Sequence, residues 1–158
     1  MQAERAAERL ERARRALAGG HVPEAVELAG SVLADFPDAG ARLRAMALQL
    51  GGTALQMAGR HREAGDWARR GLRLAVVHAR EPRLVAPLLG LVGESAQAAG
   101  QLARALVCFR HAERHFRASS EGNGVAAARA NAARFAQWRR QAANGIGKGL
   151  THQAWREG

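Results

Sequence analysis

The sequence contains few of the residues on which several protein classes depend. Its 158 residues include one cysteine, no tyrosine, four phenylalanines and four prolines. A single cysteine cannot form an internal disulfide. The scarcity of Val, Ile and aromatic runs argues against a β-sheet, because these residues dominate strands. These absences favour an all-helical protein without a disulfide framework.

Long apolar segments are also absent. No run approaches the roughly 18 apolar residues that a membrane-spanning helix needs. Residues 1–15, MQAERAAERLERARR, are charged and amphipathic and lack the apolar stretch of a secretory signal. We therefore expect a cytoplasmic protein with no membrane partner.

The residues that are abundant favour helices in a single domain. Hydrophobic residues make up 47% of the chain, and Arg supplies nearly all of the positive charge. Many of the hydrophobic residues are Ala and Leu, and Ala, Leu and Arg all have high intrinsic helix propensity. The length suits one domain with a buried core. The composition thus predicts an all-α fold.

Positive charge is concentrated after residue 40. The formal net charge is +10, and residues 1–40 contain five arginines against seven acidic residues, whereas residues 41–158 contain 19 basic and seven acidic residues. Such a field attracts phosphates and acidic protein surfaces. A solvated surface in a basic proteome would give the same counts, so both interpretations stay open.

Apolar residues recur at helical spacing between clear breakers. Pro23 suits the first turn of a helix, and residues 119–124 have the composition of a loop. Asn144-Gly145 is expected to stop the last helix and to leave residues 144–158 as a flexible tail. The predicted helices span residues 3–18, 23–36, 41–58, 61–79, 83–99, 101–118 and about 125–143.

Three glycines at predicted turns mark an internal repeat. Gly20, Gly59 and Gly100 are 39 and 41 residues apart, and small or apolar residues recur at fixed distances from each. Small residues on paired helices let the backbones approach, and successive pairs can then stack. The recurring positions are Ala13, Gly52 and Gly93; Ala25, Ala64 and Ala105; Ala29, Ala68 and Phe109; and Val32, Gly71 and Ala112.

This pattern resembles the tetratricopeptide repeat (TPR), in the long-period form of some bacterial regulators. The third unit is the closest match, because Phe109 falls on the family's aromatic position. The sequence departs from the family in its period, which is near 40 instead of ~34, and in the missing aromatic early in the first helix. The resemblance covers roughly residues 6–118.

The resemblance implies a right-handed α-solenoid over residues 1–143. Its helix-turn-helix units would be about 3–37, 41–79 and 83–118, with residues 125–143 as a capping helix. A compact helical bundle is the alternative fold. In the TPR arrangement the first helix of each unit lines a concave groove, and the groove residues would be Leu10, Arg14, Leu17, Met46, Gln49, Thr53, Gln56, Met57, Glu94 and Gln97.

A mixed apolar and amide groove suits a peptide or helix of another protein, with Met able to adapt its shape. We therefore predict a non-catalytic adaptor that needs no cofactor and acts in a bacterial regulatory or assembly system.

The alternative is a basic helical nucleic-acid-associated protein. Its patch would be Arg134, Trp138, Arg139 and Arg140, where an aromatic flanked by arginines suits base stacking; packing of Trp138 under a capping helix is the other interpretation. Self-association through exposed apolar ends also stays open.

Two motifs resemble catalytic or metal sites without completing them. Cys108, His111 and His115 share a helix face, but no fourth ligand is nearby and the sequence is not HExxH; we predict no metal. Residues 145–149, GIGKG, lack the GxxxxGK[ST] frame of a phosphate-binding loop. No serine occupies a GxSxG turn, so the sequence predicts no enzyme.

Overall fold

The computed structural model describes residues 1–119 and 125–154, and in these ranges the protein is all-helical. Seven α-helices and one π-helical segment account for nearly all of them, and no strand occurs there. The elements are α1 (Gln2–Ala18), α2 (Val22–Asp35), α3 (Ala41–Met57), α4 (His61–Arg73), η1 (Leu74–Ala79), α5 (Pro82–Ala98), α6 (Leu102–Ala118) and α7 (Val125–Ala154).

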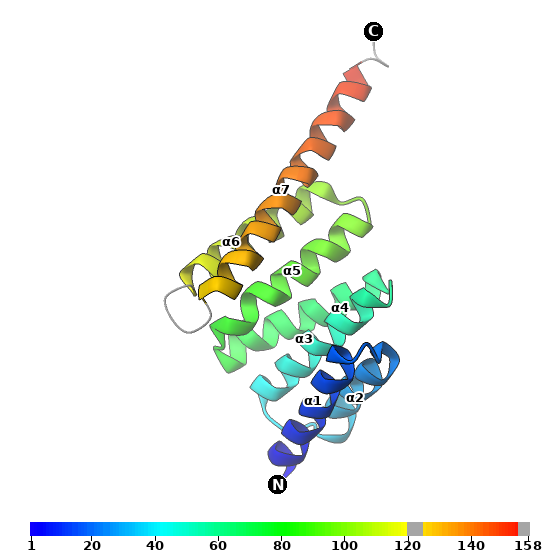
Figure 1. The fold of residues 1–158 in the computed structure, drawn as a ribbon, viewed down its shortest axis with the longest axis vertical. Coiled ribbons are helices and arrows are strands. Elements are labelled where there is room, and N and C mark those ends of the chain that lie inside the picture. Colours follow the sequence, from blue (N-terminus) through cyan, green and yellow to red (C-terminus); the bar gives the residue numbers. More distant parts are fainter. Residues whose placement is uncertain (120–124, 155–158) are drawn as a thin grey trace.

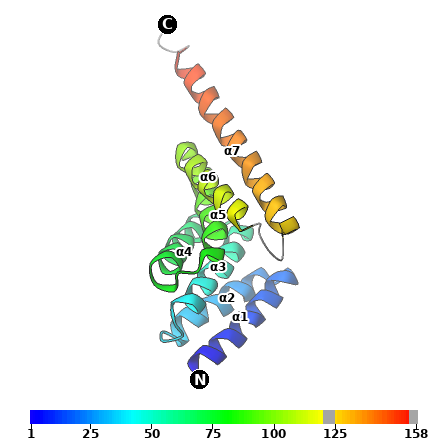
Figure 2. The ribbon, with the colours of Figure 1, turned by 90° about the vertical axis from the view of Figure 1, so that its left-hand side faces the viewer.

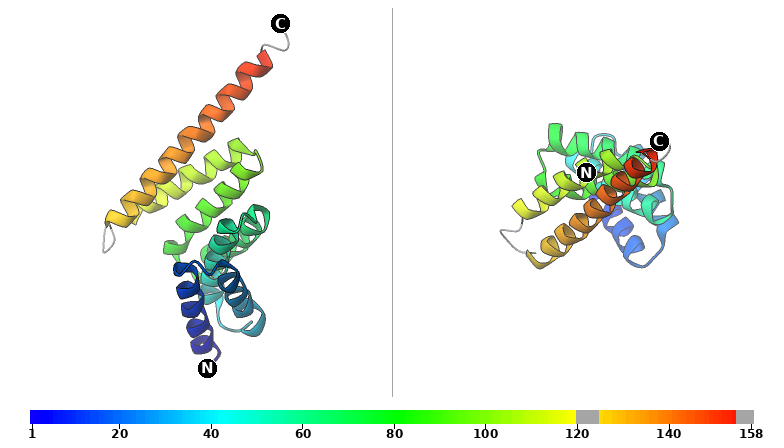
Figure 3. Two further views of the ribbon diagram at one scale, coloured as in Figure 1. Left: turned by 45° about the vertical axis from the view of Figure 1, so that its right-hand side comes forward. Right: turned by 90° about the horizontal axis from the view of Figure 1, so that it is seen from above.

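The helices pack in sequence order. Each α-helix contacts the next one along the chain, and the molecule is elongated, with α1 at one end and α7 at the other (Figure 1). The end of α7 extends beyond the other helices (Figure 2 and the left-hand view of Figure 3). None of the helices in the described ranges combines the length and apolar character needed to cross a bilayer.

The three predicted glycine turns are confirmed, and they have the same hydrogen bonds. Gly20, Gly59 and Gly100 have φ values of 79°, 76° and 75°, which a residue without a Cβ adopts without strain. The N–H of the next residue donates to the carbonyl five residues earlier in each case, as in a Schellman motif. These bonds join His21 to Ala16 (2.8 Å), Arg60 to Leu55 (2.9 Å) and Gln101 to Ala96 (2.8 Å).

The recurring small and apolar positions are buried in all three units. Every one of the twelve residues at these positions lies in the interior between helices. Gly93 shows why small residues are needed: a Cβ there would lie 2.7 Å from Cδ1 of Phe109 on the paired helix. On α6, Phe109 and Ala112 are buried, and Phe116 is partly buried against the same cluster.

The fourth predicted helix differs from expectation at its end. A single α-helix was predicted over residues 61–79, but the α-helical hydrogen bonding ends at Arg73 and η1 follows as a π-helix. Arg80 then has a left-handed φ of 48°, and the Glu81 N–H donates to the Ala75 carbonyl at 3.0 Å. The wider π turn leaves Val76 and Val77 exposed.

The prediction that the last helix stops at Asn144-Gly145 is wrong. α7 has 30 residues in total and ends at Ala154, so residues 144–154 are helical and do not form a tail. A glycine costs a helix only about 1 kcal/mol, and Gly145 lies against Leu102, where a Cβ would come within 2.8 Å of Cδ1. Packing of Gly145 against the start of α6 thus allows the helix to continue past Asn144-Gly145, which is only a weak stop signal. Residues 120–124 of the predicted loop and residues 155–158 lie outside the described residues.

Candidate functional site

The odd-numbered helices form the inner side of the array. α1 contacts α3, and α3 contacts α5, whereas α2, α4 and α6 do not pack closely on one another in the described part of the chain. The odd-numbered helices therefore lie closer to one another than the even-numbered helices do. We call the surface of α1, α3, α5 and α7 the odd-helix face; most of the groove residues predicted from the sequence lie on it.

On α3, the predicted groove residues lie opposite the helix's buried side. Met46, Gln49, Thr53 and Gln56 are half-buried, and Met57 is 59% exposed. The Thr53 hydroxyl donates to the Gln49 carbonyl at 3.0 Å, and the Gln49 amide approaches Thr53 Oγ1 at 3.4 Å. Met46 packs against the cluster that α1 and α2 form with α3. The strip is therefore mostly polar, with a methionine at either end.

Three helices converge around Glu94. Burial raises the pKa of this α5 carboxyl, while the positive charge of Arg134 on α7, a hydrogen bond from Gln56 on α3 and the proximity of His61 act in the opposite direction. Gln56 also lies 3.0 Å from Nδ1 of His61. The sequence did not indicate that Arg134 belongs beside the groove residues; the structure brings it there.

The α1 residues contribute less to this face than the sequence suggests. Leu10 is 4% exposed and packs in the core with Val32 and Phe36, and Leu17 is partly buried against another cluster. Arg14 is exposed and pairs with Glu11 on its own helix at 3.0 Å. Gln97 is half-buried on α5, one helical turn after Glu94.

Three of the four residues of the patch predicted on α7 contact other side chains of the protein. Trp138 packs against the rings of Phe109 and Phe135, with centroids 5.4 and 5.1 Å apart. The Arg134 guanidinium lies over the Trp138 ring at 4.7 Å, and Arg139 pairs with the buried Glu113 at 3.3 Å. Arg140 is exposed. Trp138 therefore packs against the aromatic side chains of α6 and α7, as one of the two interpretations of the sequence predicted.

The cysteine and histidines of α6 are not gathered into a metal-binding cluster. Within the described ranges, no three His, Cys, Asp or Glu side chains lie close enough to hold an ion together. His111 contacts Arg114 at 3.0 Å and is exposed, as is His115. Burial raises the pKa of the Cys108 thiol, against the effect of Arg104 and Arg69. Two arginines from different helices thus lie near this cysteine.

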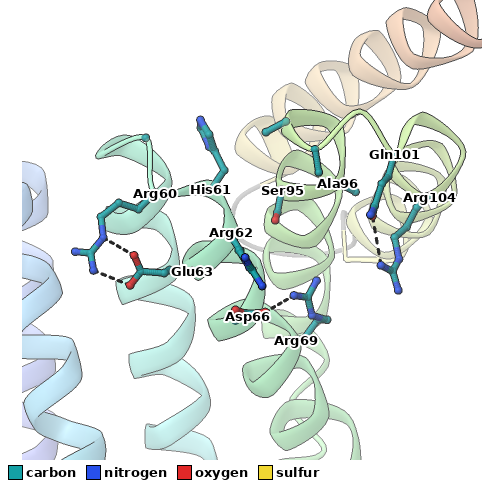
Figure 4. A pocket seen from close by; sticks show the side chains of 13 residues that line it. Arg60, His61, Arg62, Glu63, Asp66, Arg69, Ser95, Ala96, Gln101 and Arg104 are labelled. Atoms are coloured by element: carbon teal, nitrogen blue, oxygen red, sulfur yellow. Dashed lines mark hydrogen bonds and ion pairs between the residues drawn. The ribbon is translucent and has the colours of Figure 1, made fainter.

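The sequence did not indicate a hollow that lies beside His61, at the end of α5. It has a volume of about 730 Å³ and is lined by the starts of α4 and α6 and the end of α5 (Figure 4). Charged and polar side chains dominate its wall, including Arg62, Arg69, Arg104 and Ser95. The equivalent turns at Gly59 and Gly100 could have indicated this hollow, because they place the starts of α4 and α6 on the same side of the row of helices.

The chain matches no protein-family model, no curated protein and no solved structure with which it was compared. The TPR-like interpretation therefore rests on the repeat positions of this chain alone, and it stays a prediction.

Proposed function

We propose that the protein is a non-catalytic adaptor that binds an extended segment of another protein along the odd-helix face. The observation that carries the proposal is the row of half-buried polar side chains that crosses from α3 to α5 and ends at Arg134 of α7. Half-buried side chains are partly ordered before a ligand arrives, so less rotamer freedom is lost on binding.

The chemistry of this row suits a peptide main chain. A carboxamide can both donate and accept hydrogen bonds, as a peptide group requires. The Gln97 side chain makes no hydrogen bond with the described residues, and the Gln49 side chain makes only a long one to Thr53. Both amides are therefore available to a ligand. Glu94 and Arg134 add one charge of each sign, which would fix the direction and register of the bound segment.

In this proposal the array is a TPR-like right-handed solenoid and the odd-helix face is its concave groove. The closer spacing of the odd-numbered helices and the three equivalent turns support this arrangement. The outer side of α1 presents mainly charged residues, among them Glu4, Glu8, Glu11, Arg12 and Arg15. Such a polar terminal helix disfavours stacking of copies end to end through α1.

The double substitution Gln49→Ala/Gln97→Ala is expected to weaken capture of the partner at least about fivefold, because two hydrogen bonds to the ligand are lost. The measurement is affinity capture from native lysate after nuclease treatment, with quantitative identification of the eluted proteins. Glu24→Ala/Glu27→Ala, on the exposed side of α2, is the matched control and should capture the wild-type amount. Equal capture by all three proteins would contradict the proposal.

A second candidate function is nucleic-acid binding, favoured by the charge of the last two helices. The sequence of α7 contains five basic residues and no acidic residue, and α6 has four exposed arginines against the single, buried Glu113. Loss of all captured material on nuclease treatment, with binding that falls steeply as salt is raised, would favour this function over the adaptor.

A further inference from the structure

The hollow between α4, α5 and α6 carries an excess of positive charge. Arg60 pairs with Glu63 at 2.6 Å, and Arg69 pairs with Asp66, so these two guanidiniums are neutralised within the protein. Arg62 and Arg104 have no carboxylate partner among the described residues; Arg104 makes only a long contact of 3.4 Å to the Gln101 amide oxygen. Two guanidinium charges therefore remain for a ligand.

Arg62, Arg69 and Arg104 line the same hollow from two different helices. Figure 4 shows Arg62 and Arg69 on α4 across the gap from Arg104 on α6, with the Arg60–Glu63 pair on the side of α4 away from α5. Arg69 and Arg104 are both close enough to Cys108 to influence its pKa. The charges thus come from two helices that are far apart in sequence and do not pack on each other.

Two helix N-termini open at the same hollow. Residues 59–63, around the start of α4, and Gln101 and Arg104, around the start of α6, line the hollow, and neither N-terminus is capped by a side chain. The first N–H groups of each helix therefore remain available, and the helix dipole favours an anion at this end. The C-terminal end of α5 opposes this effect with its carbonyl groups, so the arginines must supply the larger part of the attraction.

Ser95 supplies an unpartnered hydroxyl at the floor. Its side chain is 8% exposed, yet its hydroxyl makes no hydrogen bond with the described residues. The other two serines that are described, Ser31 on α2 and Ser119 just after α6, each donate to a backbone carbonyl one turn back. Figure 4 shows the Ser95 oxygen on the side of α5 that faces α4. The hydroxyl lies against Gly65 of α4, where a Cβ would come within 2.2 Å of Ser95 Oγ.

We propose that this hollow binds the phosphate group of a small organic phosphate. Arg62 and Arg104 would bind the phosphate oxygens, the Ser95 hydroxyl would donate to a third oxygen, and the two free charges match those of a phosphate monoester. A volume of about 730 Å³ falls within the range of small-molecule sites, about 300–1,000 Å³. The open hollow therefore has room for the organic part of the ligand beside the phosphate.

The test is isothermal titration calorimetry with adenosine 5′-monophosphate, adenosine and inorganic pyrophosphate, at constant ionic strength. The two phosphate-bearing probes are expected to bind the wild-type protein and adenosine is not. Arg62→Gln/Arg104→Gln should weaken binding at least about tenfold, since two charge-assisted hydrogen bonds are lost. Ser95→Ala should weaken it several-fold. Arg110→Gln, an exposed arginine on the same helix as Arg104, should leave it unchanged.

Circular dichroism of each variant checks the fold, and Ser95→Ala provides a readout that does not alter the charge. Equal binding by the wild type and by Arg62→Gln/Arg104→Gln would overturn the proposal, as would equal binding of adenosine and its monophosphate. Absence of binding by both phosphate probes, with binding only of a 20-nucleotide oligothymidylate, would also overturn it and would assign the charge to nucleic acid instead.

Discussion

Phe109→Ala is expected to lower the free energy of unfolding by about 3–5 kcal/mol. Phe109 is fully buried and occupies the centre of the cluster that joins α5, α6 and α7. Its ring contacts those of Phe135 and Trp138, with centroids 5.9 and 5.4 Å away, and fills the space left by Gly93. Truncation removes the ring and leaves a cavity that the surrounding helices cannot fill without moving.

The measurement is urea denaturation followed by circular dichroism. Val107→Ala, two residues earlier on α6, is the control, because Val107 is 53% exposed and its truncation should change stability by less than about 0.5 kcal/mol. Similar small losses for the two variants would mean that α6 and α7 do not share the packed interface described above.

The pair Gly51→Ala and Gly30→Ala is expected to change stability in opposite directions, although both residues face Trp67. A Cβ at Gly51 would lie 2.7 Å from Cε3 of the indole and 3.1 Å from the Ala29 Cβ, whereas one at Gly30 would meet the ring at 3.6 Å, an ordinary contact. Both substitutions gain about 1 kcal/mol of helix propensity. Only Gly51→Ala also incurs overpacking, which costs about 1–3 kcal/mol.

Gly30→Ala should therefore raise the unfolding midpoint in urea and Gly51→Ala should lower it, with the two variants about 1–3 kcal/mol apart in stability. The m-value should stay the same, because neither change alters the surface exposed on unfolding. Stabilisation by both substitutions would show that the indole does not lie against Gly51, and the placement of Trp67 beside α2 and α3 would need revision.

Much of the architecture could be predicted from small residues. Gly59 and Gly100 are turn residues because only glycine adopts their positive φ without strain. Gly71 and Gly93 are interhelical because a Cβ there would collide with a side chain of the neighbouring helix. These requirements act on single positions, so they are visible in the sequence. The helix order and the turn positions follow from them directly.

The features that the sequence did not indicate depend on contacts between distant segments. α7 passes its expected stop because Gly145 packs beside Leu102, and η1 replaces the end of an α-helix where the chain turns toward α5. Leu10 has the spacing of a groove residue, yet the approach of α2 and α3 buries it. The hollow with Ser95 was missed because its walls come from helices that meet only after folding.

The most direct test of the adaptor proposal is photo-crosslinking from the odd-helix face. A photoreactive residue would replace Gln97 on α5, and a control protein would carry it at Glu27 on the exposed side of α2. Illumination in nuclease-treated native lysate should attach one protein to position 97, through a segment that mass spectrometry maps to a single stretch, and should attach nothing specific at position 27. Crosslinks of equal yield at the two positions, or none from position 97, would contradict the account.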